Sequence, residues 1–284
     1  MQSKVKNIVT IGGGTGSYRL LSGLKNITNI SIFAVASMAD DGGSTGILRE
    51  KFGVHPMGDI RQCFSALTLN TEMYEFLKHR NTDGHMIGNW FIAGLEKLTG
   101  NFEEALEIAT KFLKPKGTII PVTLDDAQLG VLLTNGQKIE GESKISTSDL
   151  KIVDVRKIFY RNKVQLNPKA AKAIQEADYI VICPGNFYGS IVPNLIVEGF
   201  KESLLKSRGK VIAIENLKGE DTNTYLDKLE FYLGRPVDNL IKGEAPLRSK
   251  ETIIPISGDI MKRSLIRHDS SKLAQAISKI INKK

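Results

Sequence analysis

Residues 5–16 read VKNIVTIGGGTG, an apolar and largely β-branched run that ends in a glycine-rich turn. Such a run favours a buried strand, and the glycines favour a tight turn into a following helix. A helix that starts at such a turn presents its first backbone N–H groups, and the positive end of its dipole, to an anion. Close strand–helix packing is the other explanation of these glycines. The stretch predicts a site for a phosphorylated ligand, with the candidates Gly12, Gly13, Gly14, Thr15 and Gly16.

A second strand-like run, residues 30–36, leads to the segment ADDGGSTG at residues 39–46. The helical pattern of residues 17–25 separates the two runs, so they form a strand–helix–strand unit of parallel strands. Ligands bind such sheets at the carboxyl ends of the strands, where the two adjacent carboxylates lie. Carboxylates there suit Mg²⁺ or a sugar hydroxyl, although a plain surface turn also favours Asp and Gly. The candidates from this segment are Asp40, Asp41, Gly42, Gly43 and Ser44.

Strand-like and helical runs alternate through most of the remaining chain. A helical stretch covers residues 59–113, and a closing helix covers residues 270–281. Residues 129–139 predict a β-hairpin closed by the turn Asn135-Gly136, within an antiparallel insertion at residues 118–163. We therefore predict an α/β, Rossmann-like fold: a mostly parallel sheet with helices on both faces and an antiparallel β-hairpin insertion. Because there is no internal repeat or linker, residues 1–284 are expected to form a single domain.

Further segments carry polar residues suited to an anion. PMGDIR at residues 56–61 and GHMIGN at residues 84–89 each begin a helix, and PGNFYGS at residues 184–190 follows an apolar strand. Helix capping and internal pairing explain the same residues without a ligand, and spacing leaves both explanations open. The candidates are, from these segments, Gly58, Asp59, Arg61, Asn89, Pro184, Gly185, Asn186, Ser190 and the nearby Asn194. Asn216, at the end of a later strand-like run, and Arg267, just before the closing helix, complete the set.

The composition of the chain and the absence of several known catalytic motifs limit the classes of function that it could have. The net charge of +8 mildly favours anionic partners, but the lysines are dispersed and a nucleic-acid partner is not expected. The apolar settings of Cys63 and Cys183 indicate free thiols in a reducing compartment. No signal peptide or membrane-spanning stretch is recognised, so we expect a cytoplasmic protein without membrane insertion. The P-loop, zinc-protease, kinase and nucleophile-elbow motifs are absent, and no catalytic residue is assigned.

Taken in order, these motifs resemble the gluconeogenesis factor family (YvcK-type), in the superfamily of the CofD-type 2-phospho-L-lactate transferases. The resemblance implies a cytosolic regulator that binds UDP-N-acetylglucosamine or a related UDP-sugar. It also implies support of cell shape and of growth on gluconeogenic carbon sources, a homodimer, and contacts with cell-wall synthesis or metabolic proteins. The matching segments are residues 12–16, 39–49, 56–67, 84–113, 141–145, 184–199 and 265–277.

The transferase branch supplies the alternative function. There, Asp40, Asp41 and Asp59 would hold Mg²⁺, the only cofactor that we consider, against a nucleotide-diphosphate donor. That branch typically follows the acidic pair with a bulky aromatic residue and a histidine, whereas this chain has Gly42 and Gly43. The glycines of this loop therefore favour the UDP-sugar-binding regulator over the transferase. Two departures from the nearer branch, PGNFYG at residues 184–189 and a shortened region at residues 243–261, leave the preferred sugar open.

Overall fold

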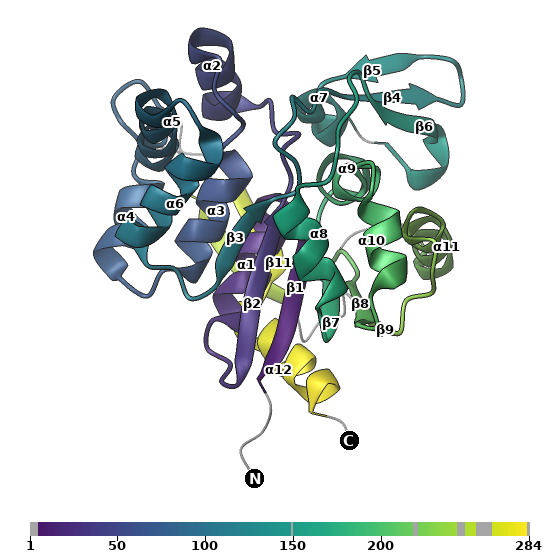
Figure 1. Cartoon of the computed structure of the whole chain (residues 1–284). Coiled ribbons are helices and arrows are strands. Elements are labelled where there is room, and N and C mark those ends of the chain that lie inside the picture. The colour runs from purple at the N-terminus through teal and green to yellow at the C-terminus, as the bar shows by residue number, and fades with distance from the viewer. Residues whose placement is uncertain (1–4, 149, 218–220, 243–247, 254–262, 283–284) are drawn as a thin grey trace.

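The computed structural model describes residues 5–148, 150–217, 221–242, 248–253 and 263–282. Most of the shortened region at residues 243–261 therefore lies outside the described residues. The elements surround one central sheet, with a smaller sheet beside one end of it (Figure 1). In the described part of the chain, no helix is both long and apolar enough to cross a bilayer.

The central sheet has six parallel strands in the order β3-β2-β1-β7-β8-β9. This order runs outward in both directions from β1 and β7, which pair with each other, so the switch point of the topology lies between them. The prediction of a Rossmann-like fold is confirmed. The strands are β1 (Lys6–Gly12), β2 (Ile30–Ala36), β3 (Thr118–Pro121), β7 (Tyr179–Ile182), β8 (Lys210–Ile214) and β9 (Asn239–Ile241).

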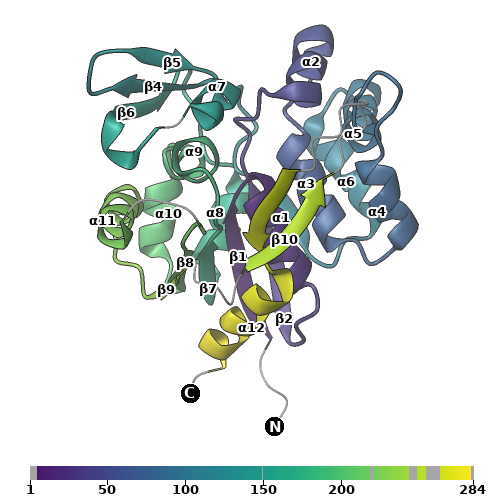
Figure 2. The same ribbon diagram turned by 180° about the vertical axis from the view of Figure 1, so that it is seen from behind.

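Helices lie on both faces of the sheet. On one face are α8 (Pro168–Gln175) and α10 (Phe200–Lys206) (Figure 1). On the other are α1 (Gly14–Leu24), α12 (Ser270–Ile281) and a hairpin of β10 (Arg248–Ile253) and β11 (Arg263–His268) (Figure 2). Ile8, Val9, Ile11, Val181 and Ile212 are fully buried, as expected for central strands covered on both sides.

The remaining helices occupy the two flanks of the sheet (Figure 1). The predicted helical stretch of residues 59–113 is confirmed as four helices. Asn101 caps the last of them by accepting a hydrogen bond from the Glu104 amide at 3.1 Å. The flanking helices are α2 (Gly43–Phe52), α3 (Gly58–Leu67), α4 (Thr71–Lys78), α5 (Ile87–Thr99), α6 (Phe102–Leu113), the π-helix η2 (Phe187–Ile191), α9 (Val192–Leu195) and α11 (Thr222–Leu233).

The antiparallel insertion is real but shorter than residues 118–163. Its sheet consists of β4 (Leu129–Leu133), β5 (Lys138–Glu140) and β6 (Val155–Tyr160) and is accompanied by α7 (Glu142–Thr147) and the short 3₁₀-helix η1 (Ile152–Asp154). The predicted Asn-Gly hairpin is confirmed between β4 and β5. Thr118–Pro121, however, pairs in parallel with β2 and belongs to the central sheet, because α6 before it acts as a crossover helix.

Candidate functional site

A pocket of about 240 Å³ lies at the switch point, between the first turn of α1 and the loop that follows β7. The structure brings together here candidates that lie far apart in the sequence. Carboxyl ends of strands beside a switch point are where α/β folds of this topology bind ligands. Seven predicted residues line the pocket, namely Thr15, Gly16, Pro184, Gly185, Asn186, Asn216 and Arg267, together with Arg19, Leu217 and His268.

The N-terminus of α1 supplies backbone donors to this pocket. Its N-cap, Gly13, has no side-chain cap, and the amide of the first helical residue, Gly14, donates to Oδ1 of Asp59 at 2.7 Å. The amides of Thr15 and Gly16, next in the first turn, have no acceptor within the helix. Both residues line the pocket, so their N–H groups and the helix dipole favour an anion.

Glycine is required in this loop because other chain segments come very close to it. A Cβ on Gly16 would lie 1.6 Å from the carbonyl oxygen of Pro184, and one on Gly13 would lie 2.1 Å from Oδ2 of Asp59. A Cβ on Gly12 would lie 2.8 Å from Cβ of Cys183. The loops after β1 and β7 therefore pack backbone against backbone, so both explanations of the glycines, close packing and anion binding, fit the same loop.

The loop after β7 is fixed by its own side chains. The Gly185 amide donates to Oδ1 of Asn216 at 2.9 Å, and Nδ2 of Asn216 donates back to the Gly185 carbonyl. Oδ1 of Asn186 accepts from the Gly189 amide at 2.8 Å. Because the Gly185 amide is already paired, Asn216 positions this loop, and the donors toward an anion come mainly from α1.

Two arginines add positive charge to the pocket wall. Arg267 was predicted from the sequence, whereas Arg19 was not. The sequence feature that could have identified Arg19 is its spacing: it follows Gly16 by three residues and so lies on the same side of the helix. His268 also lines the pocket; its Nε2 lies 3.1 Å from the Glu215 carbonyl oxygen, and burial lowers the pKa of its imidazole. The arginines are therefore the permanent cations.

A cluster of carboxyl groups lies behind the β1 loop. Burial, and then the nearby Asp40 charge, raises the pKa of Asp59 to about 8. Burial likewise raises the pKa of Glu142 to about 7 and raises that of Asp40. A Cβ on Gly58 would lie 2.0 Å from Oδ2 of Asp40, so Gly58 makes room for this group.

Arg61 and Asn89 lie inside the protein, where they hydrogen-bond to each other. Arg61 is 9% exposed and Asn89 is 3% exposed. Nε of Arg61 donates to Oδ1 of Asn89 at 2.9 Å, and Nδ2 of Asn89 donates to Oγ1 of Thr45 at 3.5 Å. Neither lines the switch-point pocket, so the structure places them in a buried polar network rather than at the pocket surface.

The other candidates lie beside the pocket or within the protein. Asn194 is fully buried. Its Nδ2 donates to the carbonyl oxygens of Ser190 and Ile191, whereas its Oδ1 has no hydrogen-bond partner among the described residues. Ser190 lies in η2 next to the β1 loop. Oγ of Ser44 lies 3.1 Å from Nδ1 of His85, and Gly42 and Gly43 form the turn that begins α2.

The three carboxylates proposed for Mg²⁺ do not form a metal site. Asp41 accepts hydrogen bonds from the amides of Glu142 and Ser143, at 3.1 and 2.8 Å, and so binds the first turn of α7. Oδ1 of Asp59 accepts a hydrogen bond from the Gly14 amide. Within the described ranges, no three His, Cys, Asp or Glu residues gather in a way that could hold a metal ion. The arrangement of these residues does not fit Mg²⁺, although carboxylates are its usual ligands.

Replacing Asp41 with alanine is expected to destabilise the fold by about 1–2 kcal/mol, because two amides of the first turn of α7 lose their acceptor. Urea unfolding followed by circular dichroism measures this loss. The exposed Asp83 provides a matched control, and Asp83→Ala is expected to change stability by no more than about 0.5 kcal/mol. Equal midpoints for the two variants would contradict the capping role of Asp41.

Stability is expected to fall as the pH rises from about 5 to 8, because folded Asp59 keeps its proton where the unfolded chain has released it. Glu142 contributes in the same direction. Asp59→Asn should flatten this slope by at most about 1.4 kcal/mol per pH unit. Urea titrations across this range test it, with Asp83→Asn as the control. A slope unchanged by Asp59→Asn would show that Asp59 is ionised in the folded protein.

Comparison with known proteins places this site in a family. The family model described as 2-phospho-L-lactate transferase CofD matches residues 8–278, which include every segment of the pocket. The chain belongs to this family. It is 32% identical to the gluconeogenesis factor of Halalkalibacterium halodurans in an alignment that covers 96% of each protein.

Other relatives agree with this assignment. The chain is 36% identical to the gluconeogenesis factor of Listeria innocua over 217 residues, which cover 74% of this chain and 66% of that protein. It spans about half the length of a relative from Nostoc sp., being 42% identical over 48% of it. A crystal structure of a UPF0052-family protein from Bacillus halodurans superposes with a TM-score of 0.82 at 29% identity, covering 97% of this chain and 99% of that one.

Proposed function

We propose that this protein binds a UDP-sugar, with UDP-N-acetylglucosamine as the leading candidate, through the diphosphate at the switch-point pocket. In this proposal it acts in the cytoplasm as a regulator of growth on gluconeogenic carbon sources and of cell shape. Its membership in the CofD family and its gluconeogenesis-factor relatives support the proposal. We assign no catalytic residue.

The observation that carries the proposal is the convergence of the α1 amides and two arginines on one small pocket. Thr15 and Gly16 provide N–H groups, and Arg19 and Arg267 provide guanidinium groups that match phosphate oxygens. A volume of about 240 Å³ is below the roughly 300 Å³ at which pockets for whole small molecules begin. The pocket therefore suits a diphosphate, with the nucleoside and sugar lying on the surfaces next to it.

The transferase alternative has one observation in its favour, which is the description of the family model itself. Catalysis of that kind needs positioning and charge stabilisation rather than a covalent residue, so a missing nucleophile does not decide the question. The geometry favours the regulator over the transferase, because the carboxylates proposed for Mg²⁺ already accept hydrogen bonds from the protein. Asp41 accepts from an amide of α7, and Asp59 accepts from the Gly14 amide.

Thermal unfolding in the presence of ligands separates these functions. UDP-N-acetylglucosamine at about 100 times its Kd is expected to stabilise the protein by about 2.7 kcal/mol without Mg²⁺. UMP, which lacks the second phosphate, should give a much smaller shift. Stabilisation by GDP that requires Mg²⁺ would instead support the transferase, and no shift with any of these ligands would overturn the proposal.

A further inference from the structure

Three carboxyl groups lie close together beside the first turn of α1, where the proposed function places an anion. They are the carboxyl cluster of Asp40, in the loop after β2, Asp59 of α3 and Glu142 of α7, and each of these residues is half-buried. Burial raises the pKa of Asp59, and so do the nearby charges of Asp40 and Glu142. If all three groups were ionised, their negative charges would repel a diphosphate bound next to them.

The carboxyl cluster has no cation that balances it. In the described parts of the chain, none of its three members makes an ion pair. Against burial and the neighbouring carboxyl charges, the charge of Arg61 lowers the pKa of Asp59 by less, and Nε of Arg61 donates to Oδ1 of Asn89 at 2.9 Å. The thiol of Cys63 stays neutral, because burial raises its pKa. Bound protons, rather than cations, therefore limit the repulsion within the cluster.

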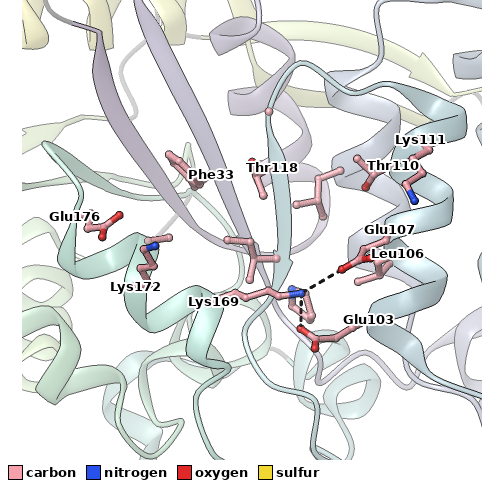
Figure 3. A pocket seen from close by; sticks show the side chains of 15 residues that line it. Phe33, Glu103, Leu106, Glu107, Thr110, Lys111, Thr118, Lys169, Lys172 and Glu176 are labelled. Carbon is pink, nitrogen blue, oxygen red and sulfur yellow. Dashed lines mark ion pairs between the residues drawn. The ribbon is translucent and has the colours of Figure 1, made fainter.

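Two glutamates elsewhere in the protein show the other way of balancing neighbouring carboxylates. In the cavity between α6 and α8, Nζ of Lys169 lies 3.2 Å from Oε1 of Glu103 and 3.6 Å from Oε1 of Glu107 (Figure 3). A permanent cation thus offsets part of the negative charge there. Because the carboxyl cluster beside α1 has no such ion pair with a described residue, its charge depends on pH.

Asp59 is the member of the cluster that contacts the glycine-rich loop after β1. Its Oδ1 accepts from the Gly14 amide at 2.7 Å, and a Cβ on Gly13 would lie 2.1 Å from its Oδ2. Gly14 directly precedes Thr15 and Gly16, whose amides are the proposed donors to the diphosphate. Asp59 therefore fixes the first turn of α1, and a negative charge on it would compete with the ligand for the positive end of the helix dipole.

We propose that Asp59 is a positioning residue of the diphosphate site that acts as a neutral carboxylic acid, so that binding of the diphosphate is linked to the uptake of a proton from solvent. This inference rests on the proposed function, because it requires a diphosphate at α1. A neutral Asp59 still accepts the hydrogen bond from Gly14 and leaves the helix dipole to the ligand. An ionised Asp59 holds the same amide but repels the ligand. The linkage is reciprocal, so a lower pH strengthens binding and binding retains the proton.

Isothermal titration of the full chain with UDP-N-acetylglucosamine at about pH 7 and about pH 9 tests this linkage. Because the pKa of Asp59 is raised to about 8, the fraction of protein with a neutral Asp59 falls about tenfold over this range, and the wild-type affinity should fall about tenfold with it. Asp59→Asn is neutral at both values, so it should bind about tenfold more tightly than the wild type at the higher pH. A purely structural role of Asp59 would not produce this gain of affinity.

Two further variants separate the charge of Asp59 from its contact with the loop. Asp59→Ala removes the acceptor of the Gly14 amide and should bind more weakly than Asp59→Asn at both pH values. The exposed Asp83 gives the matched control, and Asp83→Asn should keep the pH dependence of the wild type. His268 lines the pocket, but burial lowers the pKa of its imidazole, so it is already neutral at about pH 7 and does not produce the fall.

Proton uptake by the wild type gives a measurement that needs no variant. Titrations at about pH 8 in buffers of different ionisation enthalpy should show the uptake of at least about half a proton per bound ligand, because Asp59 is ionised in about half of the free protein there. Binding without proton uptake, or a fall in affinity at high pH that Asp59→Asn shares with the wild type, would overturn this inference and leave the proposed function standing. No binding of UDP-N-acetylglucosamine at either pH would overturn both.

Discussion

Gly16→Ala is expected to lower the free energy of unfolding by about 3 kcal/mol. The added Cβ would lie 1.6 Å from the carbonyl oxygen of Pro184 and 2.6 Å from its carbonyl carbon. Backbone atoms cannot rotate away as a side chain does, so α1 and the loop after β7 must separate. We expect the melting temperature to fall by roughly 5–10 °C, measured by calorimetry.

Gly94→Ala is the matched control for this substitution. Gly94 is exposed in the interior of α5, and a Cβ there would meet no atom within 4 Å. Alanine at this position should raise stability by about 0.5–1 kcal/mol, because it favours the helix more than glycine does. If Gly16→Ala also left the protein as stable as the wild type, the loops after β1 and β7 would not be in contact, and the pocket between them would not exist.

The Arg19→Gln/Arg267→Gln double variant is expected to bind UDP-N-acetylglucosamine at least about 100-fold more weakly than the wild type. Each guanidinium lines the diphosphate pocket, and a hydrogen bond to a charged group contributes roughly 1.5–3 kcal/mol. The loss should appear in the Kd from isothermal titration. Lysine substitutions at both positions should restore part of the affinity, because they keep the charge but not the planar fork of donors.

Arg208 is the control for charge alone. It is exposed and lies outside the pocket, so Arg208→Gln lowers the net charge without touching the site. The affinity of Arg208→Gln for UDP-N-acetylglucosamine should stay within about twofold of the wild-type affinity, since exposed charges far from a ligand are screened by salt. A double variant that binds as tightly as Arg208→Gln would place the diphosphate elsewhere.

The positions of the glycine-rich loops could be predicted from the sequence because they depend on local patterns. β-Branched runs followed by glycines place the turns after β1 and β7, and the alternation of strands and helices indicates a parallel sheet. In such a sheet, turns at the carboxyl ends of neighbouring strands necessarily meet at one edge. The convergence of Gly16 and Pro184 on one pocket is the structural counterpart of that pattern, whereas Arg267 reaches the pocket from β11 of the separate antiparallel hairpin.

The direction of individual polar side chains could not be predicted from spacing. Asp41 follows a strand as a ligand-binding carboxylate would, yet its partners are the amides of α7, about 100 residues away in the chain. Asn89 and Arg61 begin helices near the site but turn toward each other inside the protein. The sequence places the short strand Thr118–Pro121 in the insertion although it belongs to the central sheet, because four residues carry too little pattern to choose between sheets.

Amide hydrogen exchange with and without saturating UDP-N-acetylglucosamine tests most directly whether the diphosphate binds at the switch point. The amides of Thr15 and Gly16 are proposed to donate to the ligand, so peptides covering residues 13–19 should exchange more slowly in the complex. Peptides of α4, on a flank of the sheet, should not change. Binding shown by calorimetry without any protection at residues 13–19 would contradict the account.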